Sequence, residues 1–300
     1  MKTMLDILTV PKCICCFDIL PRGSSDMPFC PLCMTKWEQS VKECRIAAHG
    51  QPVRVYESGD GSGEQVSVLY IVKYVPGEKC RVENTLILKL KDDYRRRIVR
   101  FAADSMVSII KNEAPFLFDK NNPEGTVVTY IPRRRLSLWY HGFDHMQKVA
   151  KEVSRLTSFP CESLITRKLF SYEQKTLTYR ERTANAVKSM RISHKANVKG
   201  KTVILVDDII TSGASMDAAS RLFNKAGASQ VICIALAATE RTEDGSSDVR
   251  DVFNIIKKPR GGFFKKAGKQ KANTPQKKST KKKELHIMVT VAENIFGQRG

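Results

Sequence analysis

The chain has 300 residues, with 51 Lys and Arg against 31 Asp and Glu, so its formal net charge is +20. Hydrophobic residues make up 42% and charged residues 27%, which excludes collagen-like, coiled-coil and wholly disordered proteins. No stretch approaches the roughly 20 apolar residues of a membrane-spanning helix. The opening segment has no signal-peptide cleavage pattern, so we predict a cytoplasmic protein whose cysteines are reduced.

Five closely spaced cysteines lie near the start of the chain, at positions 13, 15, 16, 30 and 33. Cys13 and Cys16 form one C-x2-C pair, and Cys30 and Cys33 form a second pair after a spacer of thirteen residues. Two such pairs can place four thiolates tetrahedrally about one zinc ion. No thioredoxin-like βαβ pattern surrounds either pair, so we predict structural zinc rather than redox chemistry. The spacing leaves open whether Cys15 replaces a neighbouring ligand.

Beyond residue 125, apolar runs alternate with helical patterns, which is typical of an α/β fold with a parallel sheet flanked by helices. The predicted strands are 126–131, 203–206 and 231–237, and the predicted helices are 144–156 and 215–227. Ser215 is the expected N-cap of the second helix, and Gly227 fits its C-cap. The last two strands and this helix predict a right-handed βαβ unit. Residues 164–200 lack apolar periodicity, which suits a lid, a partner surface or a solvated excursion.

The sequence VILVDDIITSGAS (203–215) places two acids and a hydroxyl-rich loop between a buried strand and a helix. The helix N-terminus offers unpaired N–H groups, and Gly213 lets the backbone approach an anion. Carboxylates would repel that anion, so they suit sugar hydroxyls or a divalent cation. We therefore predict a ribose 5-phosphate site, although an acidic turn before a well-capped helix is the plainer alternative. Its candidate residues are Asp207, Asp208, Thr211, Ser212, Gly213, Ala214 and Ser215.

The end of the chain is strongly basic. Residues 257–283 hold twelve Lys and Arg and no Asp or Glu. Their Gly, Pro, Ser and Lys content cannot support a packed core, so we predict a disordered tail. Such a tail either keeps the protein soluble or is attracted to the phosphate backbone of nucleic acids.

The string from Val203 to Ser215 resembles the phosphoribosyl pyrophosphate (PRPP) binding motif of the type I phosphoribosyltransferases. The resemblance implies that Asp207 and Asp208 hold the ribose hydroxyls and that Thr211 to Ser215 surround the 5-phosphate. It further implies that Mg²⁺ accompanies the pyrophosphate group. Pro132 and Arg133, which follow the first predicted strand, resemble the loop that meets the pyrophosphate in that fold.

A four-cysteine module before such a domain resembles the layout of the ComF family of competence-associated proteins. Residues 132–150, and a spaced series of Arg167, Gln174, Leu177, Arg180 and Asn185, also resemble that family. The resemblance implies a zinc module in residues 1–45, a phosphoribosyltransferase-like domain in 46–240, and a polar linker with a Lys-rich tail in 241–300. It also implies DNA uptake, with PRPP, single-stranded DNA and competence-machinery proteins as partners.

The chain departs from the family pattern at positions 141–144, where His-Gly-Phe-Asp replaces Arg-Gly-Phe-Asn. His141 and His145 are four residues apart, which would suit a metal ion on a helix face, but a helix start is favoured because no third ligand is near. The sequence specifies no acceptor pocket. An active phosphoribosyltransferase of nucleotide salvage and a non-catalytic nucleotide sensor therefore remain open beside DNA handling.

Overall fold

The structure is a computed structural model that describes residues 10–21, 23–24, 26–48, 52–57, 65–93, 95–118, 125–167, 189–194 and 196–239. The whole of the predicted linker and basic tail, 241–300, and most of residues 164–200 lie outside these ranges. None of the helices in the described ranges combines the length and apolar character needed to cross a membrane.

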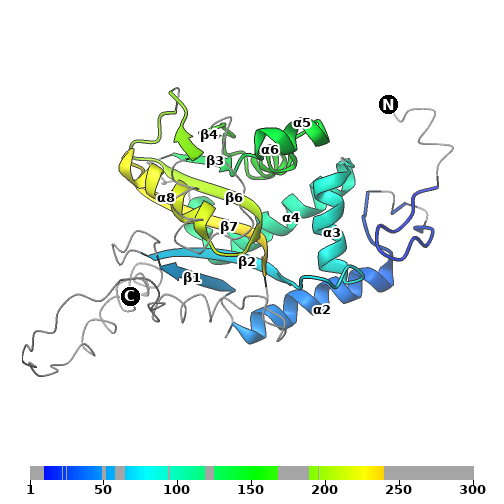
Figure 1. Ribbon diagram of the computed structural model, residues 1–300. Helices are drawn as coiled ribbons and strands as arrows, with labels where there is room; N and C mark the ends of the chain where they lie inside the picture. The colour runs from blue at the N-terminus through cyan, green and yellow to red at the C-terminus, as the bar shows by residue number, and fades with distance from the viewer. Residues whose placement is uncertain are drawn as a thin grey trace, which may run out of the picture. The chain divides into compact units, whose positions relative to one another are not determined.

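A five-stranded sheet forms the centre of the fold, in the order β1-β2-β7-β6-β3 (Figure 1). Its strands are β1 (Val53–Glu57), β2 (Gln65–Tyr74), β3 (Thr126–Tyr130), β6 (Thr202–Ile210) and β7 (Gln230–Thr239). Neighbouring strands are parallel except β1, which pairs antiparallel with β2 at one edge. The predicted strands before and after the acidic motif are therefore confirmed as neighbours in a parallel sheet.

Helices cover both faces of this sheet. They are α2 (Pro31–Ala47), α3 (Val82–Asp92), α4 (Arg96–Glu113), α5 (Arg135–His141), α6 (His145–Thr157) and α8 (Ala214–Lys225), with a 3-10 turn, η1, at Pro115–Phe118. Successive side chains of β6 point to opposite faces of the sheet and so belong to two hydrophobic cores. Ile204 and Val206 pack in the core with α3, α4 and α6. Val203 and Leu205 pack in the core with α8. The βαβ unit β6–α8–β7 and helix α6 are both as predicted.

The cysteine-rich segment shares a hydrophobic core with the helices on one face of the sheet. Phe29 and Trp37 stack with ring centroids 6.1 Å apart, and both pack edge-on against Phe101 of α4. Arg97 of α4 also donates a hydrogen bond to the carbonyl of Lys12 at 2.6 Å. The expected boundary near residue 45 therefore runs through α2, which packs against the rest of the fold.

A small second sheet lies in the region predicted as a lid, partner surface or excursion. It pairs β4 (Ile165–Arg167) antiparallel with β5 (Met190–Ile192). Leu164, Ile165 and Met190 are buried in the same core as α8, so the two ends of this excursion are anchored. Its middle, including Gln174, Leu177, Arg180 and Asn185, lies outside the described residues.

Candidate functional site

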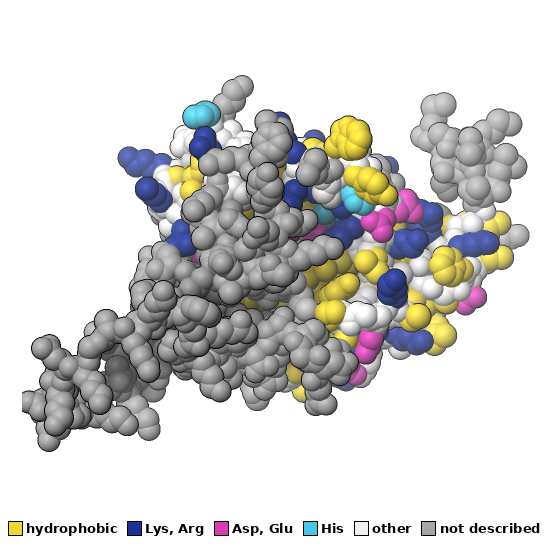
Figure 2. All heavy atoms as spheres, in the orientation of Figure 1, with side chains coloured by type: hydrophobic (Ala, Val, Ile, Leu, Met, Phe, Trp, Pro, Cys, Tyr) yellow, Lys and Arg dark blue, Asp and Glu magenta, His cyan; other side chains and the backbone are white. Residues whose placement is uncertain are grey.

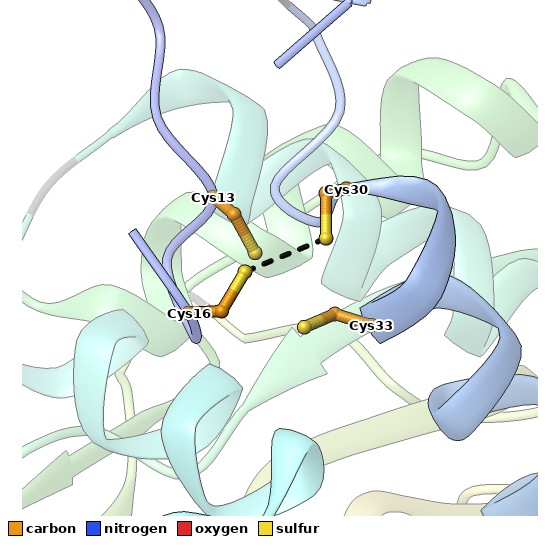
Figure 3. A group of neighbouring side chains, drawn as sticks. All are labelled: Cys13, Cys16, Cys30 and Cys33. Atoms are coloured by element: carbon orange, nitrogen blue, oxygen red, sulfur yellow. Dashed lines mark hydrogen bonds between the residues drawn. The ribbon is translucent and has the colours of Figure 1, made fainter. Parts of the chain in front are cut away.

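Four cysteine side chains converge near the start of the chain (Figure 3). The sulfur atoms of Cys13, Cys16, Cys30 and Cys33 all lie within 4.8 Å of one another, and those of Cys16 and Cys30 are 3.5 Å apart. Tetrahedral zinc with Zn–S bonds near ~2.3 Å requires sulfur atoms roughly 3.8 Å apart. The cluster therefore fits a metal ion, as the two C-x2-C pairs predict.

Cys15 lies outside this cluster. Its thiol is directed at the carbonyl of Cys80, at 3.8 Å, and accepts from the hydroxyl of Thr85 at 4.0 Å. The cysteines placed to hold a metal ion together are thus Cys13, Cys16, Cys30 and Cys33, without Cys15.

The backbone favours the thiolate form, which metals bind, at Cys13. Burial opposes ionisation of Cys13, but backbone N–H groups of the neighbouring cysteines outweigh it and lower its pKa to about 7. At Cys33, burial and then hydrogen bonds with the other thiols raise the pKa instead. Cys30 caps α2, and Pro31 follows at the first helical position, where its missing N–H costs nothing. The second cysteine pair is therefore held at the start of a regular helix.

The acidic motif differs in detail from its sequence prediction. Strand β6 continues to Ile210, so Asp207 and Asp208 lie within the strand rather than after it. Helix α8 begins at Ala214 with Gly213 as its N-cap, so Ser215 is not the cap and the turn comprises only residues 211–213. The cap at the other end is Ala226, and Gly227 follows it in the left-handed region.

Gly213 is shaped by a contact with a distant strand. Its φ is +70°, and a Cβ atom there would lie 2.5 Å from the ring of Tyr56 in β1. Tyr56 is itself buried. Only glycine fits this position, which explains why the predicted serine cap does not form: the chain turns at Gly213 before Ser215 is reached.

The two acids point to opposite faces of the sheet, as successive strand residues do. Asp208 accepts a hydrogen bond from Nε2 of His145 at 2.5 Å, and Nζ of Lys91 lies 3.3 Å from the same oxygen. Burial disfavours the charged form, but the His145 hydrogen bond and the Lys91 charge lower the pKa of Asp208 to about 2. Asp208 is therefore a buried anion shared by α3, β6 and α6.

Asp207 has a different environment. Burial and then the charge of Asp208 raise its pKa to about 8, against the weaker influence of Arg167 and Lys91. Its carboxylate accepts from the backbone N–H of Asp208 at 2.9 Å. Arg167, at the end of β4, is desolvated, which lowers its pKa, and the nearby Asp207 partly offsets this. The acids thus differ in charge state as well as direction.

The segment after β3 is tied to the same region. Arg133 donates through its guanidinium to the carbonyls of Lys91 at 2.9 Å and Phe143 at 3.4 Å. Its backbone N–H donates to Asp144, which also caps α6 through the N–H groups of Met146 and Gln147. The predicted helix start at Asp144 is confirmed, and His145 faces Asp208 rather than a metal site with His141.

Helix α5 presents aromatic side chains to solvent beside this segment. Trp139 is 86% exposed and Tyr140 is 81% exposed, and Arg135 starts the same helix. Figure 2 shows hydrophobic side chains standing out from the surface here, close to basic ones. Large exposed aromatics are unusual on a soluble protein and commonly mark a binding surface.

Two hollows lie away from the acidic motif. One, of about 760 Å³, lies between α2 and the loop before α3 and includes Cys80 and Glu83. The other, of about 460 Å³, lies between α2, α4 and β2 and includes Trp37 and Tyr70. Neither is lined by residues of the 207–215 segment.

Comparison with protein families matches the family model "Phosphoribosyl transferase domain" to residues 147–267, which include the whole β6–α8–β7 unit. The chain contains a phosphoribosyltransferase-type domain. A transcriptional regulator, GfcR, of Methanosphaera stadtmanae is 40% identical over 67 residues, covering 22% of this chain and 33% of that protein. Competence protein F of Haemophilus influenzae is 25% identical over 103 residues, covering 34% and 45%. The chain thus spans less than half the length of these relatives.

Solved phosphoribosyltransferase structures are also similar to this chain. An adenine phosphoribosyltransferase is 15% identical, with 67% of this chain and 97% of that chain covered and a TM-score of 0.32. A hypoxanthine phosphoribosyltransferase from Trypanosoma cruzi with IMP is 8% identical, with coverage of 47% and 66% and a TM-score of 0.30.

The structure adds residues that the sequence did not single out. Lys91 reaches Asp208 from α3, and Tyr56 packs on Gly213 from β1. Both lie more than a hundred residues from the motif, and neither has a local pattern that points to it. His145 was noticed only for its spacing from His141, whereas its partner is an acid on another element.

Proposed function

We propose that the phosphoribosyltransferase-type domain binds PRPP, or a related ribose 5-phosphate ligand, at the end of β6. The single observation that carries this proposal is the glycine turn at Gly213, which opens α8 just after the strand that carries the two acids. Thr211, Ser212 and Ser215 would donate to the 5-phosphate, together with the free N–H groups of the first turn. The backbone at Gly213 and Ala214 would approach it most closely.

The ribose would lie over the acids. Asp207 would accept from its hydroxyls, while Asp208, held by His145 and Lys91, would contribute a fixed negative charge. Mg²⁺ would accompany the pyrophosphate group near Pro132 and Arg133, where it would neutralise phosphate charge. In this arrangement Arg133 shapes the loop through its backbone contacts, since its guanidinium already binds two carbonyls.

We further propose that the four-cysteine cluster holds a structural zinc ion in a reducing, cytoplasmic setting. Sulfur-only sites with four closed positions are typical of structural zinc. The proposed modules are a zinc-binding segment at 1–45, which ends within α2, a phosphoribosyl domain at 46–240, and a polar linker with a Lys-rich tail at 241–300.

Calorimetric titration tests the ligand proposal. We expect saturable binding of PRPP with Mg²⁺ to the zinc-loaded wild type, and at least ~10-fold weaker binding to Asp207→Asn, because an amide NH2 group replaces one of the two oxygen atoms that accept hydrogen bonds from the ribose. Glu162→Gln, a neutralised acid outside the motif, is the matched control. A folded wild type without detectable PRPP binding would refute the proposal.

A competence-type role in handling single-stranded DNA is the second candidate function. Similarity to competence protein F supports it, as do the exposed Trp139 and Tyr140 beside Arg135. Aromatic rings stack on the bases of single strands, while arginines attract the phosphates. Partner proteins of the competence machinery would follow from the same role.

Binding to an oligo(dT) strand, measured by fluorescence anisotropy, tests this second function. Base stacking is worth about 1–3 kcal/mol, so Trp139→Ala is expected to weaken binding roughly 5- to 150-fold. Log affinity should also fall steeply with log salt concentration. Phe116→Ala, which removes an exposed aromatic of η1, is the control. If Trp139→Ala leaves the affinity for the strand unchanged and deletion of residues 257–300 abolishes binding, the strand binds the tail instead.

A further inference from the structure

The proposed ligand carries its pyrophosphate group past Asp208, a buried anion that repels it. A cation close to Asp208 is therefore needed on the ligand's side. Arg133 is the cation that the sequence suggests, but its guanidinium is engaged with the carbonyls of Lys91 and Phe143. Lys91 is different, because its ammonium lies 3.3 Å from Asp208 while its side chain stays 31% exposed.

The position of Lys91 is fixed by its helix. It is the penultimate residue of α3, whose Leu86, Ile87 and Leu90 are fully buried in the core. Its carbonyl accepts from Arg133, so the backbone of α3 is tied directly to the loop after β3. The flexible stem can therefore move the ammonium by a few ångströms while the backbone stays in place.

Lys91 belongs to a ring of contacts that joins α3, β6, α6 and the loop after β3. Lys91 pairs with Asp208, which accepts a hydrogen bond from His145. Asp144, next to His145, accepts from the backbone N–H of Arg133, and the guanidinium of Arg133 donates to the carbonyl of Lys91. His145 and the backbone N–H of Ile209 keep Asp208 hydrogen-bonded if the lysine turns away. An ammonium has three donors, so Lys91 can bind phosphate oxygens beyond the one contact that it makes with Asp208.

We propose that Lys91 binds the pyrophosphate group of the phosphoribosyl ligand, as a cation supplied by α3 rather than by the motif. This inference rests on the proposed function of the 207–215 segment. Lysine binds phosphate as a compact point charge, and Asp208 orients that charge before the ligand arrives. Lys91 would thus distinguish PRPP from ribose 5-phosphate, which lacks the pyrophosphate.

Calorimetric titration of Lys91→Met with each ligand, in the presence of Mg²⁺, tests this role. PRPP binding is expected to weaken roughly 10- to 100-fold, as for a lost charge-assisted hydrogen bond, whereas ribose 5-phosphate binding should change by less than about twofold. Lys91→Arg keeps the charge and should retain most of the PRPP affinity. Lys89→Met, on the same helix turn, is the control and should bind both ligands normally.

Two results would overturn the inference while leaving the proposed function intact. If Lys91→Met weakens the binding of both ligands equally, Lys91 acts only by arranging Asp208. If Lys91→Met leaves PRPP binding unchanged, Lys91 has no role in binding the pyrophosphate group. Circular dichroism and the Tm of each variant exclude unfolding as the cause, and Lys91→Arg provides a variant that keeps the ion pair. Wild-type protein that binds neither ligand would contradict the proposed function itself, and this inference with it.

Discussion

Replacing Cys30 and Cys33 together by serine is expected to abolish zinc binding and to destabilise the fold by several kcal/mol. Structural zinc contributes about 10–16 kcal/mol of binding free energy in zinc-finger peptides, although packing of the segment on α4 offsets part of the loss here. Without the metal, the segment that carries Cys13 and Phe29 loses a link that holds it against Trp37 and Phe101. Metal analysis by mass spectrometry and thermal unfolding measure the two effects.

Cys80→Ser is the matched control for this variant. Cys80 is an exposed cysteine beside Cys15 but outside the four-sulfur cluster. The Cys80→Ser protein should therefore retain one zinc ion per chain and an unchanged Tm. If the Cys30→Ser, Cys33→Ser protein keeps both its zinc and its Tm, the four-cysteine cluster does not hold a structural zinc ion.

Gly213→Ala is expected to destabilise the fold by about 2–5 kcal/mol and to abolish phosphoribosyl binding. A left-handed conformation costs a non-glycine residue about 1–2 kcal/mol, and overpacking adds about 1–3 kcal/mol. Both apply, because φ is +70° and the new Cβ would lie 2.5 Å from the buried ring of Tyr56. Denaturant unfolding and PRPP titration measure the two losses.

Gly200→Ala separates the two causes. Gly200 has a φ of +69°, but nothing lies within 4 Å of its added Cβ. It should cost only the conformational part, about 1–2 kcal/mol, and leave PRPP binding unchanged. Equal destabilisation by the two variants would mean that the Tyr56 ring moves aside, and that the contact with β1 does not shape the turn.

The features that the sequence predicted correctly depend on local patterns. The cysteine pairs predicted the cluster correctly, because two C-x2-C turns joined by a short spacer can converge with few contacts to other segments. The β6–α8–β7 unit followed from short continuous apolar runs, which are typical of a strand covered on both faces. Helix α6 followed from an apolar face and an aspartate at its start.

The features that the sequence missed depend on contacts between distant segments. The start of α8 was predicted wrongly at Ser215 because the ring of Tyr56, far away in the sequence, packs on the turn at Gly213. The acids were expected to act as a pair, whereas the alternation of β6 and the placement of Lys91 and His145 give them different surroundings. The insertion of β2 between β1 and β7 likewise has no local pattern.

Phosphorus NMR of PRPP titrated with the protein and Mg²⁺ tests the central claim most directly, because the 5-phosphate and the pyrophosphate give separate resonances. The turn at 211–213 and the start of α8 should shift or broaden the 5-phosphate resonance in the wild type and in Lys91→Met, but not in Gly213→Ala. A wild-type spectrum in which the 5-phosphate resonance stays unchanged at saturating protein would contradict the assignment of this turn as a phosphate site.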